Sequence, residues 1–262
     1  MTLGPVLQRL HGVRRIRLLP YFRFIGLLLA ASIQAGPPLL TDDPDTPGPN
    51  HWEINVATTS ENLQHEWVFG TPLLDMNYGV GDHIQLKYQV QANILAPDHG
   101  GVVAGMGNSL AGVKWRFMDQ TNSSWLEVST YPQLEFIYTG SSARRGLADA
   151  GDNVLLPIEI EHKFKSLTVY AEGGFIWNEH QPSAALYGVA GEYELTEKFT
   201  LMGEFYGGFD RAFENNGLSF NIGFGRPLTE HIALIGSAGR GINGPATRAP
   251  AFQSYLALQL TF

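Results

Sequence analysis

The stretch from His83 to Ile94, HIQLKYQVQANI, alternates polar and apolar side chains for twelve residues without interruption. Because successive side chains of a β-strand point to opposite faces of its sheet, this pattern predicts a strand with one apolar and one polar face. The class of the protein depends on which face is turned outward. In a water-soluble sandwich the apolar face would form the core, and in a membrane barrel it would face lipid.

The same alternation recurs along the rest of the chain. We expect twelve strand segments, at residues 52–58, 73–80, 83–94, 112–117, 125–138, 156–164, 167–177, 185–195, 199–209, 218–225, 231–239 and 254–262. Pro72 interrupts the second segment and predicts a bulge or a late start there. The odd-numbered connections are mostly long and the even-numbered ones mostly short, the first and fourth being exceptions. Outer-membrane barrels, which have short periplasmic turns and long external loops, show this sorting.

The length of the alternating segments distinguishes a membrane barrel from a water-soluble sandwich. Several segments reach the roughly 9–11 residues that a tilted strand needs to cross a bilayer, whereas strands of soluble proteins average nearer 5–6. Charged side chains avoid the apolar register, apart from His162 and Arg226 near strand ends. An arginine or lysine at mid-depth would cost roughly 2–4 kcal/mol there. The sequence therefore predicts an all-β protein, a transmembrane antiparallel up-and-down β-barrel of about 12 strands.

The first 35 residues have a different character. They contain five arginines and no acidic residue, followed by the apolar run FIGLLLAASI and a group of small residues. These features predict a secretory signal peptide over residues 1–35, cleaved after Ala35, because the run is too short for a membrane-spanning helix. We expect a solvated periplasmic lead-in over residues 36–50 and an outer-membrane barrel over residues 51–262. The remaining chain carries twelve basic and 25 acidic side chains, which argues against nucleic acid as a partner.

The polar register predicts what fills the barrel. We expect fourteen charged side chains to line the interior: Glu53, Asp75, Lys87, Lys114, Arg116, Glu127, Glu135, Glu159, Glu161, Lys163, Glu172, Glu192, Glu194 and Glu204. Unpaired charges in a dry core would be prohibitive, so the interior must hold water, ion pairs or both. Two interpretations stay open. One is a narrow pore whose acidic lining favours cations or neutral polar solutes, and the other is a nearly closed barrel in which the bases neutralise adjacent glutamates. The loops after residues 95, 138 and 239 are long enough to fold inward as a constriction.

The C-terminus carries a further signal. Tyr255, Leu256, Leu258, Leu260 and the terminal Phe262 resemble the C-terminal recognition strand of bacterial outer-membrane proteins. The resemblance implies that the barrel-assembly machinery reads these residues and that periplasmic chaperones deliver the chain. The lipid bilayer and lipopolysaccharide are then further expected partners.

A more specific resemblance starts just after the predicted signal peptide. The stretches AGPPLLTDDPDTPGPNHWEINV at 35–56 and GNSLAGVKWRF at 107–117 resemble an outer-membrane barrel family, the meta-pathway phenol-degradation transporters. The resemblance implies a role near the uptake of aromatic compounds and brings no catalytic residues. The acidic TDDPD motif lacks the spaced ligands of an EF-hand, so we expect a solvated segment there and no metal site.

Motifs of catalysis are missing from the sequence. There is no G-x-S-x-G, no H-E-x-x-H and no cysteine, and GRGING at 239–244 runs into a proline and opens no helix. We therefore expect no enzyme, no cofactor and no catalytic residue, and predict a channel or transporter for passive uptake of small solutes, including aromatic or other hydrophobic compounds. The alternatives are a non-conducting structural or surface-interaction barrel, and less favoured, an outer-membrane enzyme or the translocator of an autotransporter.

Overall fold

The protein is a closed antiparallel barrel in the computed structural model, which describes residues 37–120, 125–210 and 216–262. The strands are β1 Trp52–Asn62, β2 Glu66–Val80, β3 Ile84–Pro97, β4 Val103–Met118, β5 Glu127–Thr130, β6 Gln133–Phe136, β7 Asn153–Lys163, β8 Leu167–Asn178, β9 Ala184–Thr196, β10 Phe199–Asp210, β11 Gly217–Pro227, β12 Ile232–Asn243 and β13 Phe252–Thr261. Apart from β5 and β6, each strand pairs with its neighbour in sequence, and β1 pairs with β13 from Glu53↔Thr261 to Asn62↔Phe252. This last pairing closes the barrel.

The strands β5 and β6 together form one wall position, so the barrel is built from twelve strand positions, as predicted. Both pieces pair with β4 on one side and β7 on the other, and they are separated by Tyr131 and Pro132. Proline has no backbone N–H to donate, which explains why the ladder is interrupted there. The inward register continues through the break, and the side chain of Tyr131 is completely buried.

Two strands start earlier than the alternation predicts. The strand β2 begins at Glu66 and passes Pro72 through a register shift between Gly70 and Leu73, the bulge expected at this proline. The strand β4 begins at Val103, well before residue 112. Its first half is rich in glycine and small residues and shifts register against β3 between Val90 and Ala92, and both features hide the period of two.

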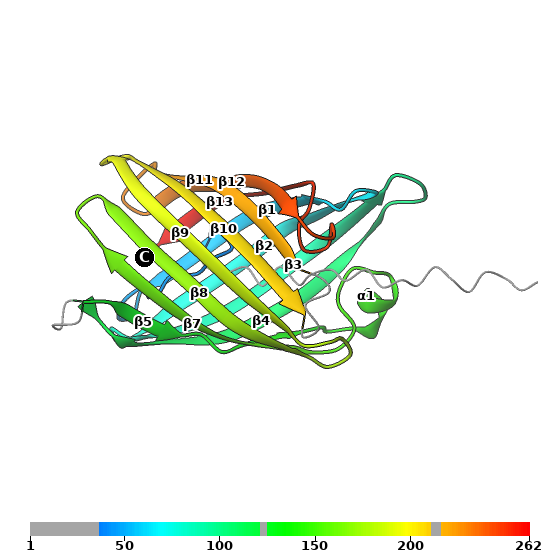
Figure 1. Cartoon of the computed structure of the whole chain (residues 1–262), viewed down its shortest axis with the longest axis horizontal. Coiled ribbons are helices and arrows are strands. Elements are labelled where there is room, and N and C mark those ends of the chain that lie inside the picture. Colours follow the sequence, from blue (N-terminus) through cyan, green and yellow to red (C-terminus); the bar gives the residue numbers. More distant parts are fainter. Residues whose placement is uncertain (1–36, 121–124, 211–215) are drawn as a thin grey trace, which may run out of the picture.

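The two ends of the barrel differ. We call the end that holds the start of β1 and the end of β13 the turn end, and the opposite end the loop end. The turn end carries the connections 81–83, 164–166, 197–198 and 228–231 and residues 119–120 and 125–126, and the loop end carries 63–65, 98–102, 137–152, 179–183 and 244–251 and residue 216. The helix α1 Gly140–Arg144 lies in the longest of these loops, and Figure 1 shows it at the opposite end from the C-terminus.

No helix among the described residues is long and apolar enough to cross a membrane.

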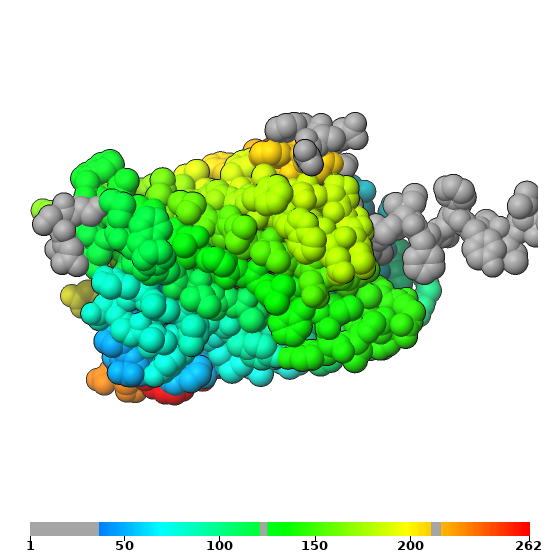
Figure 2. All heavy atoms as spheres, turned by 90° about the horizontal axis from the view of Figure 1, so that it is seen from below, coloured from blue at the N-terminus to red at the C-terminus, as the bar shows by residue number. Residues whose placement is uncertain are grey.

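The outer face of the wall is apolar. On the side seen in Figure 2, the side chains of β2–β4 and of β7–β9 form a continuous surface without a cleft. Large apolar side chains that are exposed on the outer register include Val56, Leu86, Val113, Leu134, Leu156, Ile158, Ile160, Val189, Leu201, Phe205, Ile222, Leu256 and Leu258. Soluble monomers rarely expose contiguous apolar surface on this scale, so the apolar face is the surface that meets lipid. The predicted transmembrane barrel is confirmed.

Candidate functional site

Residues 37–45, which precede β1, enter the barrel from the turn end. Leu39, Thr41 and Asp42 are buried, and Leu39 packs against Tyr170 together with Ala190. Residues 37–45, which we call the inserted segment, are therefore not the solvated stretch that we expected, whereas Pro49 and Asn50 are exposed. Two acidic side chains of the TDDPD motif form ion pairs with basic side chains of the barrel wall instead of being solvated by water alone.

Glu204 of β10 binds the backbone of the inserted segment. Its carboxylate accepts hydrogen bonds from the Leu40 amide at 2.8 Å, from the Thr41 amide at 2.7 Å and from the Thr41 hydroxyl at 2.7 Å. Asn221 of β11 donates a further bond at 2.6 Å, and Glu172 of β8 accepts one from the Asp42 amide at 3.2 Å. These buried carboxylates replace the water that the polar backbone of the segment would otherwise need.

Lys114 of β4 is the main charged contact between the wall and the inserted segment. Its ammonium group lies 2.9 Å from the Asp42 carboxylate and 3.5 Å from that of Glu159, and it also donates to the backbone oxygen of Asp43. The ammonium lies 4.8 Å above the centre of the Tyr131 ring. All of these side chains except that of Asp43 are buried, so the charges are held away from bulk water.

A second charged network lies nearer the turn end. Arg116 contacts Asp45 of the inserted segment at 3.0 Å and Glu127 at 3.2 Å. Lys163 contacts the same two carboxylates at 2.8 and 3.5 Å, and that of Glu161 at 3.0 Å. Three wall strands are thereby linked to the inserted segment where it enters the barrel.

The other expected interior residues are placed as follows. Lys87 and Asp75 form a buried ion pair at 3.1 Å, and Tyr170 donates to the half-buried Glu192 at 3.1 Å. Glu53 is half-buried beside Asn55. Glu194 is exposed near the turn that follows β9 and takes no part in the interior network described here. Its position differs from expectation because the end of β9 extends beyond the packed part of the barrel.

At the loop end, the loop 137–152 folds into the mouth of the barrel. Leu147 is completely buried against Val68 and Leu95, and its backbone oxygen accepts a bond from Asn93 at 2.7 Å. Behind it, Asp149 approaches Glu135 of β6. Of the three loops expected to be long enough to form a constriction, this one inserts a buried apolar side chain.

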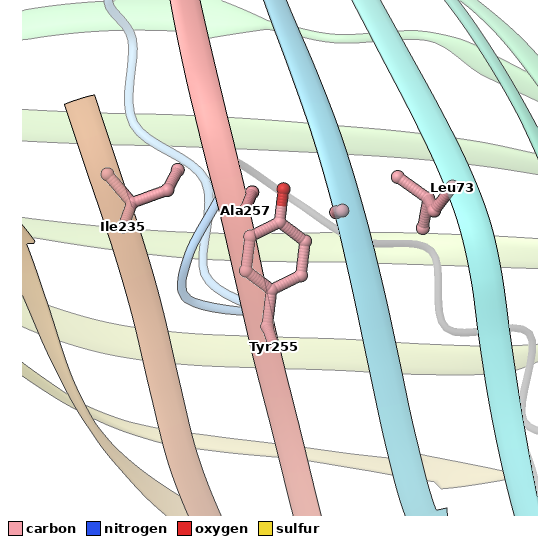
Figure 3. Close-up of a cluster of buried hydrophobic side chains, with 5 residues drawn as sticks. Leu73, Ile235, Tyr255 and Ala257 are labelled. Atoms are coloured by element: carbon pink, nitrogen blue, oxygen red, sulfur yellow. The ribbon is translucent and has the colours of Figure 1, made fainter. Parts of the chain in front are cut away.

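The inner wall also has an apolar patch. It consists of Ala57, Leu73, Ile235, Tyr255 and Ala257. Figure 3 shows Leu73, Ile235, Tyr255 and Ala257 on neighbouring strands. Tyr255, which we grouped with the C-terminal assembly signal, is therefore buried inside the barrel. The other members differ from it, since Leu256, Leu258 and Phe262 are exposed and Leu260 is half-buried.

A solvent-open cavity reaches into the barrel from the loop end. Its empty volume, including the part open to solvent, is about 1120 Å³. It lies between the loops 137–152, 179–183 and 244–251, and Leu40 of the inserted segment contributes to its wall. The lining mixes apolar groups with amides and charges: Ile176, Leu186, Tyr206, Asn153, Asn178, Gln253, Glu61, Asp149 and Arg248.

Carboxylates also gather around the TDDPD motif. One oxygen each of Asp43, Asp45 and Glu161 lie within 4.8 Å of one another. Lys163 contacts two of these residues, and Lys114 contacts the backbone of the third. The positive charge that such a cluster requires is thus already supplied by protein side chains.

The sequence analysis missed the carboxylates of the inserted segment and Asp149 as interior groups. All of them lie outside regular strands, where a period of two gives no information. One local signal could have indicated an ionic contact. The TDDPD motif is unusually rich in acidic residues, and residues 112–117 carry basic side chains and no acidic one.

Comparisons with known proteins support the fold. The chain is similar to the crystal structure of the COG4313 outer membrane channel from Pseudomonas putida F1, with 13% identity, a TM-score of 0.67, and coverage of 84% of this chain and 98% of that one. It is also similar to the NanC porin, with 9% identity, a TM-score of 0.58, and coverage of 79% and 98%. A third similar structure is the KdgM porin in complex with disordered oligogalacturonate, with 10% identity, a TM-score of 0.54, and coverage of 80% and 99%.

No family model matches the chain, and no curated protein matches it either. The similarity to solved structures therefore establishes the barrel fold, and the resemblance to the phenol-degradation transporters stays a prediction.

Proposed function

We propose that the protein is a channel of the bacterial outer membrane that admits small solutes through a narrow, largely occupied interior. The observation that carries the proposal is the contrast between the two faces of the wall. The outer face is apolar, whereas the inner face holds buried charges, hydrogen-bonded carboxylates and a cavity open to solvent. A barrel that served only as a membrane anchor would have no need for a polar interior, because apolar packing would be at least as stable.

Buried polar atoms support an interior that contains water. Gln89 Oε1, both polar atoms of the Gln133 side chain and the Tyr255 hydroxyl make no hydrogen bond to the described protein atoms. Each such group costs about 1–3 kcal/mol unless water reaches it. We infer hydrated space beside β3, β6 and β13, the strands that carry these atoms.

Paired charges and the inserted segment leave little free space inside the barrel. All four interior bases (Lys87, Lys114, Arg116 and Lys163) form ion pairs with neighbouring carboxylates. Residues 39–42 occupy part of the cross-section. We therefore favour a restricted channel over an open pore of the general-porin kind, and expect small conductance with a preference for cations or neutral solutes.

The cavity at the loop end is the first part of this route. It offers the Tyr206 ring and the aliphatic side chains of Ile176 and Leu186 beside amides and the Arg248 guanidinium. Such a lining suits small amphipathic solutes. Aromatic compounds, which the resemblance to phenol-degradation transporters also suggests, are the first class to screen. The similar KdgM porin is in complex with a disordered oligogalacturonate, so short acidic saccharides are the contrasting class to screen, and the preference for cations or neutral solutes predicts that they pass poorly.

The remaining envelope assignments belong to the same proposal. Residues 1–35 would direct export and be removed after Ala35. The C-terminal strand would be read by the assembly machinery after periplasmic chaperones deliver the chain, and Arg144 and Arg240, exposed at the loop end, would meet lipopolysaccharide phosphates.

The second candidate function is a non-conducting barrel whose external loops bind a partner, without catalysis. The inserted segment and the paired bases favour this alternative, because both reduce the free cross-section of the interior. It predicts a silent barrel, and loss of partner binding when residues 139–153 are deleted.

The test is planar-bilayer conductance of the protein purified from membranes, measured in a salt gradient so that the reversal potential reports ion preference. Cation-selective openings that change in the Glu127→Gln variant support the proposal. The matched control is Glu197→Gln, a change in the exposed turn between β9 and β10. A folded barrel without conductance, and without solute uptake in liposome swelling, would favour the second candidate. Turnover of lipid or peptide by the purified protein would instead support an enzyme.

A further inference from the structure

Two carboxylates that form no ion pair with any described base meet where the loop 137–152 enters the barrel. Asn108 of β4 donates from one side-chain nitrogen to Glu135 and, at 3.3 Å, to Asp149. Asn153 of β7 donates to Glu135 at 3.1 Å and to Asp149 at 3.4 Å. The amide of Asp149 also donates to Asn108 at 3.0 Å. The two acids thus share the same two donors and are held side by side.

The described basic side chains near this pair either bind another group or are exposed to solvent. Arg145 donates to the backbone oxygen of Ala104 at 2.8 Å, and Arg144 is exposed on α1. On the neighbouring loop 179–183, His180 lies 4.0 Å from Glu179, whose carboxylate accepts from the backbone amide of Asp152.

Further charges face the same cavity from other elements. Glu61 of β1 and Arg248 of the loop 244–251 line it, and Asp210 of β10 is the acid that acts on Arg248. Within the described residues no ion pair joins a base to Glu135 or Asp149. A buried carboxylate and the half-buried one beside it, with no described cation between them, cannot both stay ionised cheaply, so one proton shared between them is the favourable arrangement.

The pair connects the loop to the wall. Asp149 belongs to the loop and Glu135 to β6, and only Ala148 separates Asp149 from the completely buried Leu147. A second negative charge on the pair would push the loop away from the wall, and Leu147 would move with it. We propose that Glu135 and Asp149 form a proton-dependent latch that holds the loop 137–152 in the barrel mouth and releases it when the shared proton is lost.

The direction of the pH effect follows from Asp149. Burial, and then the negative charge of Glu135, raise the pKa of Asp149 to about 8 in the closed loop. In an open, hydrated loop its pKa would be near 3.9. The closed state binds the proton more tightly, so closure is favoured at acid pH and is lost progressively as the pH rises towards about 8. The open-to-closed ratio can rise by up to about tenfold per pH unit in this window.

The latch can be tested without measuring conductance, because the chain has no cysteine. Ala148 is buried and Ala150 is exposed, and they flank Asp149. Single Ala148→Cys and Ala150→Cys variants of the full-length protein are labelled in liposomes with a membrane-impermeant maleimide between pH 5.5 and 8.5. The ratio of the two rates cancels the titration of the thiol itself and reports exposure of the loop.

We expect this ratio to rise at least tenfold across the pH range in the native background, and to stay flat when Asp149→Asn is added. The matched control is Asp152→Asn, in the same loop but outside the pair, which should keep the rise. If Asp149→Asn does not fold, Glu135→Gln removes the same repulsion from the wall side. A flat ratio in the native background, or an unchanged rise in the Asp149→Asn background, would overturn the latch.

Control of solute passage by the latch rests on the proposed function, and the two can be tested separately. If the labelling ratio responds to pH while no solute passes at any pH, the channel proposal fails and the latch stands. If solutes pass but the ratio is flat, the latch fails and the channel proposal stands.

Discussion

Replacing Lys114 by methionine tests the contact on which the position of the inserted segment depends. Lys114 is 1% exposed and holds two buried carboxylates, those of Asp42 and Glu159. Methionine keeps the length and apolar stem of the side chain and removes only the ammonium group. The expected effect is therefore electrostatic and not a packing defect.

The size of the effect follows from burial. Removing one partner of a buried ion pair typically costs about 3–5 kcal/mol, because the other charge is left uncompensated. The ammonium also lies above the Tyr131 ring, a contact that adds roughly 1–2 kcal/mol when desolvated. Because both contacts are lost, we expect Lys114→Met to lower the free energy of unfolding by about 4–7 kcal/mol. Adding Asp42→Asn and Glu159→Gln should restore more than half of the loss, since neutral amides need no counter-charge.

The assay is urea unfolding in lipid vesicles, followed by the fluorescence of the five tryptophans. Lys165→Met, in the exposed turn between β7 and β8, is the matched control and should stay within about 0.5 kcal/mol of the native protein. The reasoning is refuted if Lys114→Met behaves like the control, or if the triple variant is less stable than the single one.

Three further predictions test other parts of the structure. Leu256→Arg should cost about 2–4 kcal/mol in bilayer unfolding experiments, because the side chain meets lipid; a cost near zero would contradict a transmembrane wall. Gly79→Ala should cost about 1–3 kcal/mol in the same assay, because its Cβ would lie 1.7 Å from the backbone oxygen of Gly48, whereas Gly203→Ala meets nothing closer than 3.7 Å and serves as the control. Glu204→Gln should lower hydrogen-exchange protection of the amides it binds in the inserted segment by roughly 10- to 100-fold, and unchanged protection would show that this carboxylate does not hold the segment.

The twelve-strand barrel was predictable because its signal is local. Alternation along a strand fixes which side chains share a face, and the arrangement of short and long connections indicates an up-and-down order. The residues from His83 to Ile94 show this well: polar and apolar positions fall on opposite faces of β3, as the pattern predicts. The prediction was weakest where side chains are small, as in the first half of β4, or where a proline interrupts the ladder, as at Pro132.

The contents of the barrel were decided by tertiary structure alone. Asp42 and Lys114 are 72 residues apart in sequence, and Thr41 and Glu204 are 163 apart, so no local pattern links them. The sequence showed that the wall carries inward charges. It did not show that the segment before β1 would supply their partners, or that Asp149 would approach Glu135 with no described base paired to either. Burial of a charge depends on which distant groups surround it, and closure of the barrel is what brings those groups together.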